Sequence, residues 1–129
     1  MIVLDTDAWS YIYKADSRAE LVRPHIAGER VAITFQTVAE LHFWAVHRKW
    51  RVARINDLEA AIARFVLLDS DLATSRAWAD IRAKRASVGK PIAPQDAWIA
   101  ACARRHNARL LTHNAADYQL IDGLEVIAI

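Results

Sequence analysis

Four carboxylates lie shortly after expected strands or near the start of a helix beside them: Asp5, Glu40, Asp96 and Asp117. Asp5 directly follows the apolar run "IVL", and Asp96 opens the apolar segment "DAWIAACA". An uncompensated carboxylate is costly beside buried apolar surface, and clustered carboxylates repel one another unless they are protonated or bridged by cations. If the fold brings the four together, their combined chemistry is that of a site for a divalent cation.

The donor types indicate which cation such a site would hold. Oxygen-only ligands suit Mg²⁺ or Mn²⁺ better than zinc. The five histidines show no metal-binding spacing, and the single Cys102 excludes both a thiolate zinc cage and an internal disulfide. The "GK" at positions 89–90 lacks the earlier glycine of a phosphate-binding loop, and no G-x-S-x-G motif is present. The remaining possibility is a divalent metal that is held by carboxylates and acts on a phosphate.

Each acidic residue also has a purely structural explanation. Asp7 is well placed to cap a helix that begins at Ala8, which is the favoured interpretation of that residue. Asp96 would occupy the third position of a helix that has Pro94 at its first, where negative charge suits the helix dipole. Asp117 could complete a local cap, and Glu40 could lie on the polar face of its helix. Taken singly, each of these explanations competes evenly with metal binding.

The elements that must position these residues alternate between short apolar runs and longer helical patterns. Strands are expected at residues 2–4, 30–35, 65–68, 108–112 and 124–129. Helices are expected at residues 8–13, 17–27, 36–49, 51–65, 72–87 and 94–106. Apolar strands separated by helices indicate a parallel sheet covered on both faces. The fold class is therefore α/β: a three-layer α/β/α sandwich with a central, mainly parallel five-stranded sheet, formed by residues 1–129 as a single domain.

Composition fits one globular domain. The chain has 129 residues, of which 54% are hydrophobic and 25% charged, and its formal net charge is +2. No segment is apolar for the roughly 18 residues that a membrane span needs, and no signal peptide is recognised, so a cytoplasmic protein is expected. Two cationic clusters, "HRKWRVAR" and "RAKR", could contact nucleic acid, although a solvated helix face is the commoner explanation of such clusters.

Four stretches together resemble the PIN domain, specifically the VapC-type toxins of bacterial toxin–antitoxin pairs. They are "MIVLDTDAWSYIYK", "ITFQTVAEL", "GKPIAPQDAWIAACA" and "LLTHNAADY", and they occur in the family's order and spacing over essentially the whole chain. The resemblance implies a PIN fold and a Mg²⁺-dependent endoribonuclease, with Mn²⁺ as a possible substitute. It also implies an RNA substrate and a cognate antitoxin protein as partners. The five tryptophans are many for this length, and although core packing explains most of them, some could form a homodimer contact or an antitoxin groove.

Carried over by position, Asp5, Glu40, Asp96 and Asp117 match the family's catalytic and metal-binding acids. Thr112 and Asn114 match the polar residues that support the site. Arg82 lies where many relatives carry an arginine, so the resemblance gives it contact with a substrate phosphate. Asp7 stands where asparagine or serine is common, so beside its role as a cap it could add a fifth, supporting carboxylate near the metal.

Three alternatives remain. In a haloacid-dehalogenase-like phosphatase, Asp5 would be the nucleophile. A PIN nuclease could act in RNA processing or on DNA. A relative without catalytic activity could bind RNA or protein, although such relatives usually lose acids that this chain keeps.

Overall fold

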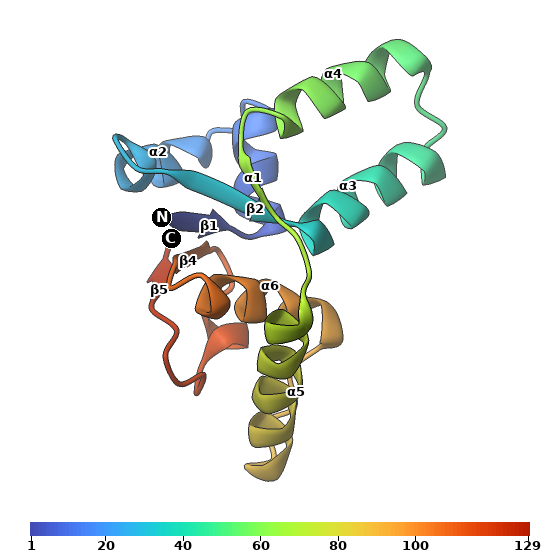
Figure 1. Ribbon diagram of the computed structural model, residues 1–129. Helices are drawn as coiled ribbons and strands as arrows, with labels where there is room; N and C mark the ends of the chain where they lie inside the picture. The colour runs from blue at the N-terminus through green and yellow to red at the C-terminus, as the bar shows by residue number, and fades with distance from the viewer.

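The computed structural model describes residues 1–129 as a parallel five-stranded sheet between two layers of helices (Figure 1). The strands are β1 (Ile2–Leu4), β2 (Val31–Thr34), β3 (Val66–Leu68), β4 (Arg109–Thr112) and β5 (Val126–Ala128). The helices are α1 (Thr6–Tyr13), α2 (Ala19–Ile26), α3 (Phe35–His47), α4 (Val52–Ile62), α5 (Leu72–Ser87) and α6 (Pro94–Arg105), with a short 3₁₀ helix η1 (Ala115–Tyr118). The predicted three-layer α/β/α class is confirmed, and no helix is both long and apolar enough to cross a membrane.

The sheet has the strand order β3-β2-β1-β4-β5, and every neighbouring pair is parallel. From β1 the chain moves outward to β2 and β3, and it then returns to place β4 on the other side of β1. In open sheets of this kind, ligands bind outside the carboxyl ends of the strands, where the strand order reverses. That position lies here between the ends of β1 and β4.

Side chains of β1 alternate between two separate cores. Ile2 and Leu4 pack into a cluster with α1 to α4, whereas Val3 packs into a cluster with α5 and α6. All three residues are fully buried, as the period of two along a strand requires when helices cover both faces. Because β1 is held from both sides, the residue that follows it has a well-defined position.

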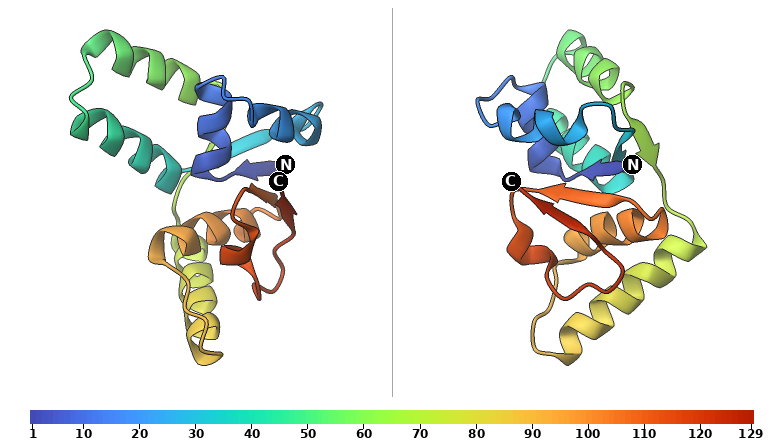
Figure 2. Two further views of the ribbon diagram at one scale, coloured as in Figure 1. Left: turned by 180° about the vertical axis from the view of Figure 1, so that it is seen from behind. Right: turned by 90° about the vertical axis from the view of Figure 1, so that its left-hand side faces the viewer.

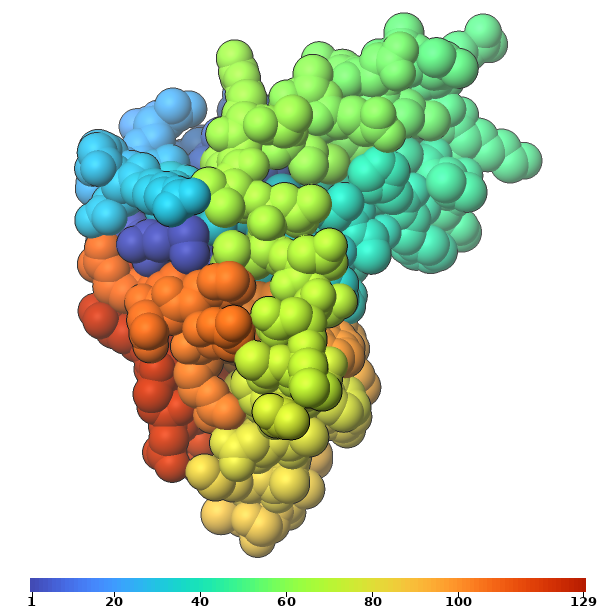
Figure 3. All heavy atoms as spheres, in the orientation of Figure 1, coloured from blue at the N-terminus to red at the C-terminus, as the bar shows by residue number.

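The α3 and α4 helices form an arm that extends away from the sheet, with its tip at the connection between them (Figures 1 and 2). The space-filling view shows this arm projecting from the body (Figure 3). The amino-terminal end of α3 lies at the sheet and its far end lies at the tip. Only the first turns of α3 can therefore contribute to a site at the strand ends.

Most predicted helices and strands are confirmed, with ends that differ by up to three residues. The difference between prediction and structure that matters most for the site is at α1, which begins at Thr6 and not at Ala8. The sequence also gave no indication of η1, because a single 3₁₀ turn has too few residues to show a hydrophobic period.

Candidate active site

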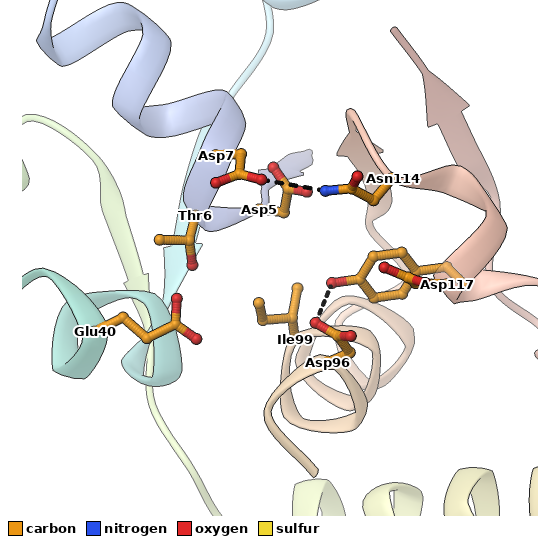
Figure 4. Close-up of a pocket in the computed structure, with 9 residues that line it drawn as sticks. Asp5, Thr6, Asp7, Glu40, Asp96, Ile99, Asn114 and Asp117 are labelled. Atoms are coloured by element: carbon orange, nitrogen blue, oxygen red, sulfur yellow. Dashed lines mark hydrogen bonds between the residues drawn. The ribbon is translucent and has the colours of Figure 1, made fainter. Parts of the chain in front are cut away.

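A hollow at the carboxyl ends of the strands gathers the predicted acidic residues (Figure 4). Its lining comprises Asp5, Thr6, Asp7, Glu40, Asp96, Ile99, Asn114, Asp117 and Tyr118. All four predicted acids are in this set, although they come from the N-cap of α1 and from α3, α6 and η1. The expected convergence is confirmed by the geometry.

Asp5 is the N-cap of α1. Its backbone is extended (φ −72°, ψ 173°), and its Oδ1 accepts a hydrogen bond from the Ala8 backbone N–H at 2.8 Å. The prediction that Asp7 would be the cap is wrong, because the helix begins two residues earlier and Asp7 already lies in its first turn. Asp7 instead lines the hollow and accepts a bond from Asn114 Nδ2 at 3.1 Å.

A second hydrogen bond ties Asp5 to the neighbouring strand. Thr112, the last residue of β4, donates from Oγ1 to Asp5 Oδ2 at 2.5 Å, and Thr112 Oγ1 in turn accepts from the Asn114 backbone N–H at 2.9 Å. Thr112 is fully buried and Asp5 is only 4% exposed. Thr112 thus contacts Asp5 directly, and Asn114 contacts Thr112 through its backbone N–H.

Burial raises the pKa of Asp5 from 3.8 to about 6. The bonds from Thr112 and Ala8 act in the opposite direction, since they favour the charged form, and the nearby charges of Asp7 and Asp96 raise the pKa further. The carboxylate is thus held in a fixed orientation at a place where its negative charge is poorly compensated.

Asp96 lies in the first turn of α6, whose N-cap is Ala93 and whose first residue is Pro94. Tyr118, which is buried, donates from its hydroxyl to Asp96 Oδ1 at 3.3 Å (Figure 4). Burial raises the pKa of Asp96, and the charges of Asp117 and Glu40 add to the effect. The electrostatic crowding expected for clustered carboxylates is therefore present between residues of three different elements.

Glu40 approaches from the opposite side of the hollow (Figure 4). It lies in the second turn of α3 and accepts from Gln36 Nε2 at 3.0 Å. The start of α3 is joined to α1 by a contact between the buried hydroxyls of Thr6 and Thr37 at 3.0 Å. This contact fixes the helix that carries Glu40 relative to the cap at Asp5.

The donor set consists of carboxylate, amide and hydroxyl oxygens, which suits a hard divalent cation. No three acidic, histidine or cysteine side chains converge closely enough to surround an ion by themselves. Mg²⁺ is bound in many proteins through one or two carboxylates while water completes its octahedron. A hollow with carboxylates on several sides fits that kind of coordination.

The cationic residues are placed differently from the acids. Arg82 is not among the residues that line the hollow, and its guanidinium lies over the Trp78 ring at 5.2 Å. The cluster at 47–54 lies at the tip of the α3–α4 arm, where Arg54 stacks on Trp50 at 3.8 Å. Sequence reasoning missed Arg85, which is buried beneath η1 and the loop before α6.

Comparison with known proteins agrees with this geometry. The family model of the PIN domain matches residues 2–123. The VapC ribonuclease Y4jK of Sinorhizobium fredii is 33% identical over 98% of this chain and 96% of its own length. The tRNA(fMet)-specific endonuclease VapC of Shigella flexneri is 26% identical over 95% of this chain and 92% of its own.

A solved structure shows the same fold over nearly the full length. VapBC-1 from nontypeable Haemophilus influenzae superposes with a TM-score of 0.84 and 27% identity, and the match covers 99% of this chain and 98% of that one. Family model, relatives and structure thus agree on one assignment. This chain belongs to the PIN domain family and, within it, to the VapC-type proteins.

Proposed function

We propose that this protein is a Mg²⁺-dependent endoribonuclease and the toxin of a type II toxin–antitoxin pair. The observation that carries the proposal is the convergence of four carboxylates, from the N-cap of α1 and from α3, α6 and η1, around one hollow at the carboxyl ends of the strands. The names of the matched relatives, a VapC ribonuclease and a tRNA-specific VapC endonuclease, support hydrolysis of RNA. Membership in the PIN family argues against the alternative of a haloacid-dehalogenase-like phosphatase.

Asp5 and Asp96 would be the principal metal ligands, with Glu40 and Asp117 completing the site directly or through water. When bound, Mg²⁺ would supply neutralisation of phosphate charge and a lowered pKa of coordinated water, and Mn²⁺ could replace it. The raised pKa values of Asp5 and Asp96 are consistent with carboxylates that lack a compensating cation. This chemistry matches the oxygen-only donor set.

Other residues of the chain orient the carboxylates of the proposed metal ligands. The Ala8 N–H and the Thr112 hydroxyl fix both oxygens of Asp5, and Tyr118 holds one oxygen of Asp96. Attack by water on the phosphorus atom, with departure of the 3′ oxygen, leaves a 5′-phosphate and a 3′-hydroxyl. A 2′,3′-cyclic phosphate would instead indicate attack by the 2′-hydroxyl and would refute this mechanism.

The partner proposals follow from the relatives. The Haemophilus influenzae structure is of a VapBC protein, which supports a cognate antitoxin as a partner of this chain. We expect a homodimer, and we expect action in the cytoplasm, where the RNA substrate is found. Transfer RNA is the first substrate to test, because the Shigella flexneri relative is named for cleavage of tRNA(fMet).

The decisive experiment is cleavage of total cellular RNA by the purified full chain with and without Mg²⁺, followed by sequencing of the fragment ends. Asp96→Asn should reduce cleavage strongly with the fold intact. Asp122→Asn is the matched control, because its side chain is 89% exposed and lies outside the hollow. Cleavage of DNA alone, or wild-type cleavage by Asp96→Asn, would reject the proposal.

A further inference from the structure

Arg85 is a buried cation whose contacts are unusual. It is 7% exposed, it lies on α5, and it forms no salt bridge with a carboxylate. Instead it donates to three backbone carbonyls: from Nε to Lys90 at 2.6 Å, and from one terminal nitrogen to Asp117 at 3.0 Å and to Gln119 at 2.8 Å. A guanidinium is always charged, so burying it is tolerated only where its N–H groups find such acceptors.

The three carbonyls belong to two segments that carry acids of the site. Lys90 lies in the loop between α5 and α6 that leads to Asp96. Asp117 and Gln119 flank Tyr118, so Arg85 holds the backbone on both sides of that tyrosine. The Tyr118 hydroxyl donates to Asp96, which links the two segments a second time at the hollow.

The short helix η1 is anchored by Tyr118, which is buried in the core that includes α6, and it makes few hydrogen bonds of its own. It is a single 3₁₀ turn, its N-cap makes no side-chain hydrogen bond, and the backbone bond from Asp117 N–H to Asn114 spans only three residues. A turn of this length has no cooperative stability of its own. The position of the Asp117 carboxylate therefore depends on anchors from elsewhere in the fold, and Arg85 supplies two of them.

We propose that Arg85 is a positioning residue for the Asp96 and Asp117 half of the metal site, an inference that rests on the proposed function above. Arg85 acts through the backbone and does not touch substrate. It contrasts with Arg82 on the same helix, which lies over an indole ring. Residues that orient metal ligands affect metal affinity or activity by roughly 10- to 100-fold when they are changed.

The test measures metal binding apart from catalysis. Binding of Mn²⁺ alone to the full chain is followed by calorimetry, without RNA, at a temperature where circular dichroism shows every variant folded. Arg85→Ala should weaken Mn²⁺ binding by about 10-fold, at the low end of that range. Arg85→Lys should restore only part of the affinity, because one ammonium group cannot reach acceptors in both segments as the planar fork does.

Chemical rescue adds a readout that general destabilisation would not produce. Guanidinium at millimolar concentration should restore Mn²⁺ binding to Arg85→Ala, and ethylammonium at the same concentration should not. In cleavage assays the same variant should lower kcat while KM for RNA stays within about twofold, since the substrate contacts are intact.

Two controls separate positioning from stability. Arg76→Ala removes an exposed cation from the same helix and should leave Mn²⁺ binding unchanged. Val22→Ala shortens a fully buried side chain in the opposite core, so it lowers the melting temperature without touching the α5–η1 contacts. If Arg85→Ala behaves like Val22→Ala, with a lower melting temperature but wild-type Mn²⁺ affinity and kcat, the proposal is overturned.

The outcomes also distinguish this inference from the proposed function. A wild-type chain that binds Mn²⁺ but cleaves no RNA rejects the ribonuclease, while the calorimetry still tests Arg85. A wild-type chain that binds no divalent metal rejects both. If Arg85→Ala does not fold, Arg85→Lys decides the matter: full wild-type affinity would refute the positioning role, and reduced affinity in a folded chain would support it.

Discussion

Replacing Asp5 by asparagine should change the free energy of unfolding of the metal-free protein in a pH-dependent way. The variant should be more favourable relative to wild type at neutral pH than at acid pH. The wild-type carboxyl is 4% exposed, and its pKa is raised from 3.8 to about 6, chiefly by burial. Asparagine keeps an oxygen for the Ala8 N–H and can donate to Thr112, but it carries no charge to desolvate. The substitution therefore removes the pH-dependent part of the free energy and leaves most of the contacts.

The sign follows from linkage. The pKa of Asp5 is higher in the folded than in the unfolded state. The contribution of its protonated carboxyl to the free energy of unfolding is therefore fully present below about pH 3.8, and it is lost as the pH rises through about 6. A shift of this size corresponds to about 3 kcal/mol above pH 6. Roughly 2 kcal/mol of that loss falls between pH 4.5 and 7, and about 1 kcal/mol has already occurred at pH 4.5.

The assay is urea unfolding of both proteins in EDTA at pH 4.5 and pH 7. The free energy of unfolding of Asp5→Asn minus that of wild type should increase by roughly 2 kcal/mol between the two pH values. Asp16, whose pKa is lowered to about 2 by its bonds to Arg18, titrates below this range in both proteins. Asp122→Asn is the control and should show no pH-dependent difference, because its side chain is largely exposed. A constant difference between Asp5→Asn and wild type would refute the assignment of Asp5 as a desolvated carboxylate.

Three further changes test other parts of the site. Thr112→Val should lower the free energy of unfolding by about 1–3 kcal/mol in urea titrations, because it leaves the buried N-cap carboxylate with one partner fewer, and it should also reduce cleavage. Tyr118→Phe should keep the fold by circular dichroism and lower kcat more than it raises KM, since the hydroxyl that it removes contacts Asp96 and not the RNA; an unchanged kcat would contradict this. Replacing Arg48 and Arg54 together by glutamine should flatten the dependence of RNA affinity on salt, measured by fluorescence anisotropy, if the arm binds RNA phosphates. An unchanged slope would assign the arm to another role.

Asp5 and Asp96 could be predicted from the sequence because each one borders a stretch whose apolar character fixes where it must lie. Asp5 follows a strand that is buried on both faces, and Asp96 follows Pro94 at the start of a buried helix. Parallel strands place their carboxyl ends at one edge of the sheet, so the convergence follows from local patterns and a general rule. The sequence does not decide whether Asp5 or Asp7 caps α1, because either residue can cap, and only the backbone angles at Asp5 identify it as the N-cap.

The arginines show what local patterns do not contain. In "RAKR" the sequence offers Arg82, Lys84 and Arg85 as equivalent members of one cationic cluster. Arg85 differs because two of its three acceptors lie 32 and 34 residues further along the chain, in a loop and turn with no periodic signal. Partners that are distant in sequence and held by backbone atoms leave no trace in residue types, so this contact required the structure.

The pairing of β1 with β4 has a consequence for the timing of synthesis. Ile2 pairs with Arg109, so the first strand made stays open along one edge until more than one hundred further residues have been translated. A nascent chain that has emerged only to residue 100 contains Asp5, Glu40 and Asp96, but it lacks Thr112, which orients Asp5, and Asp117. Such a chain cannot assemble the hollow. Because Thr112 and Asp117 come late in the chain, the hollow can form only after most of the chain has been translated.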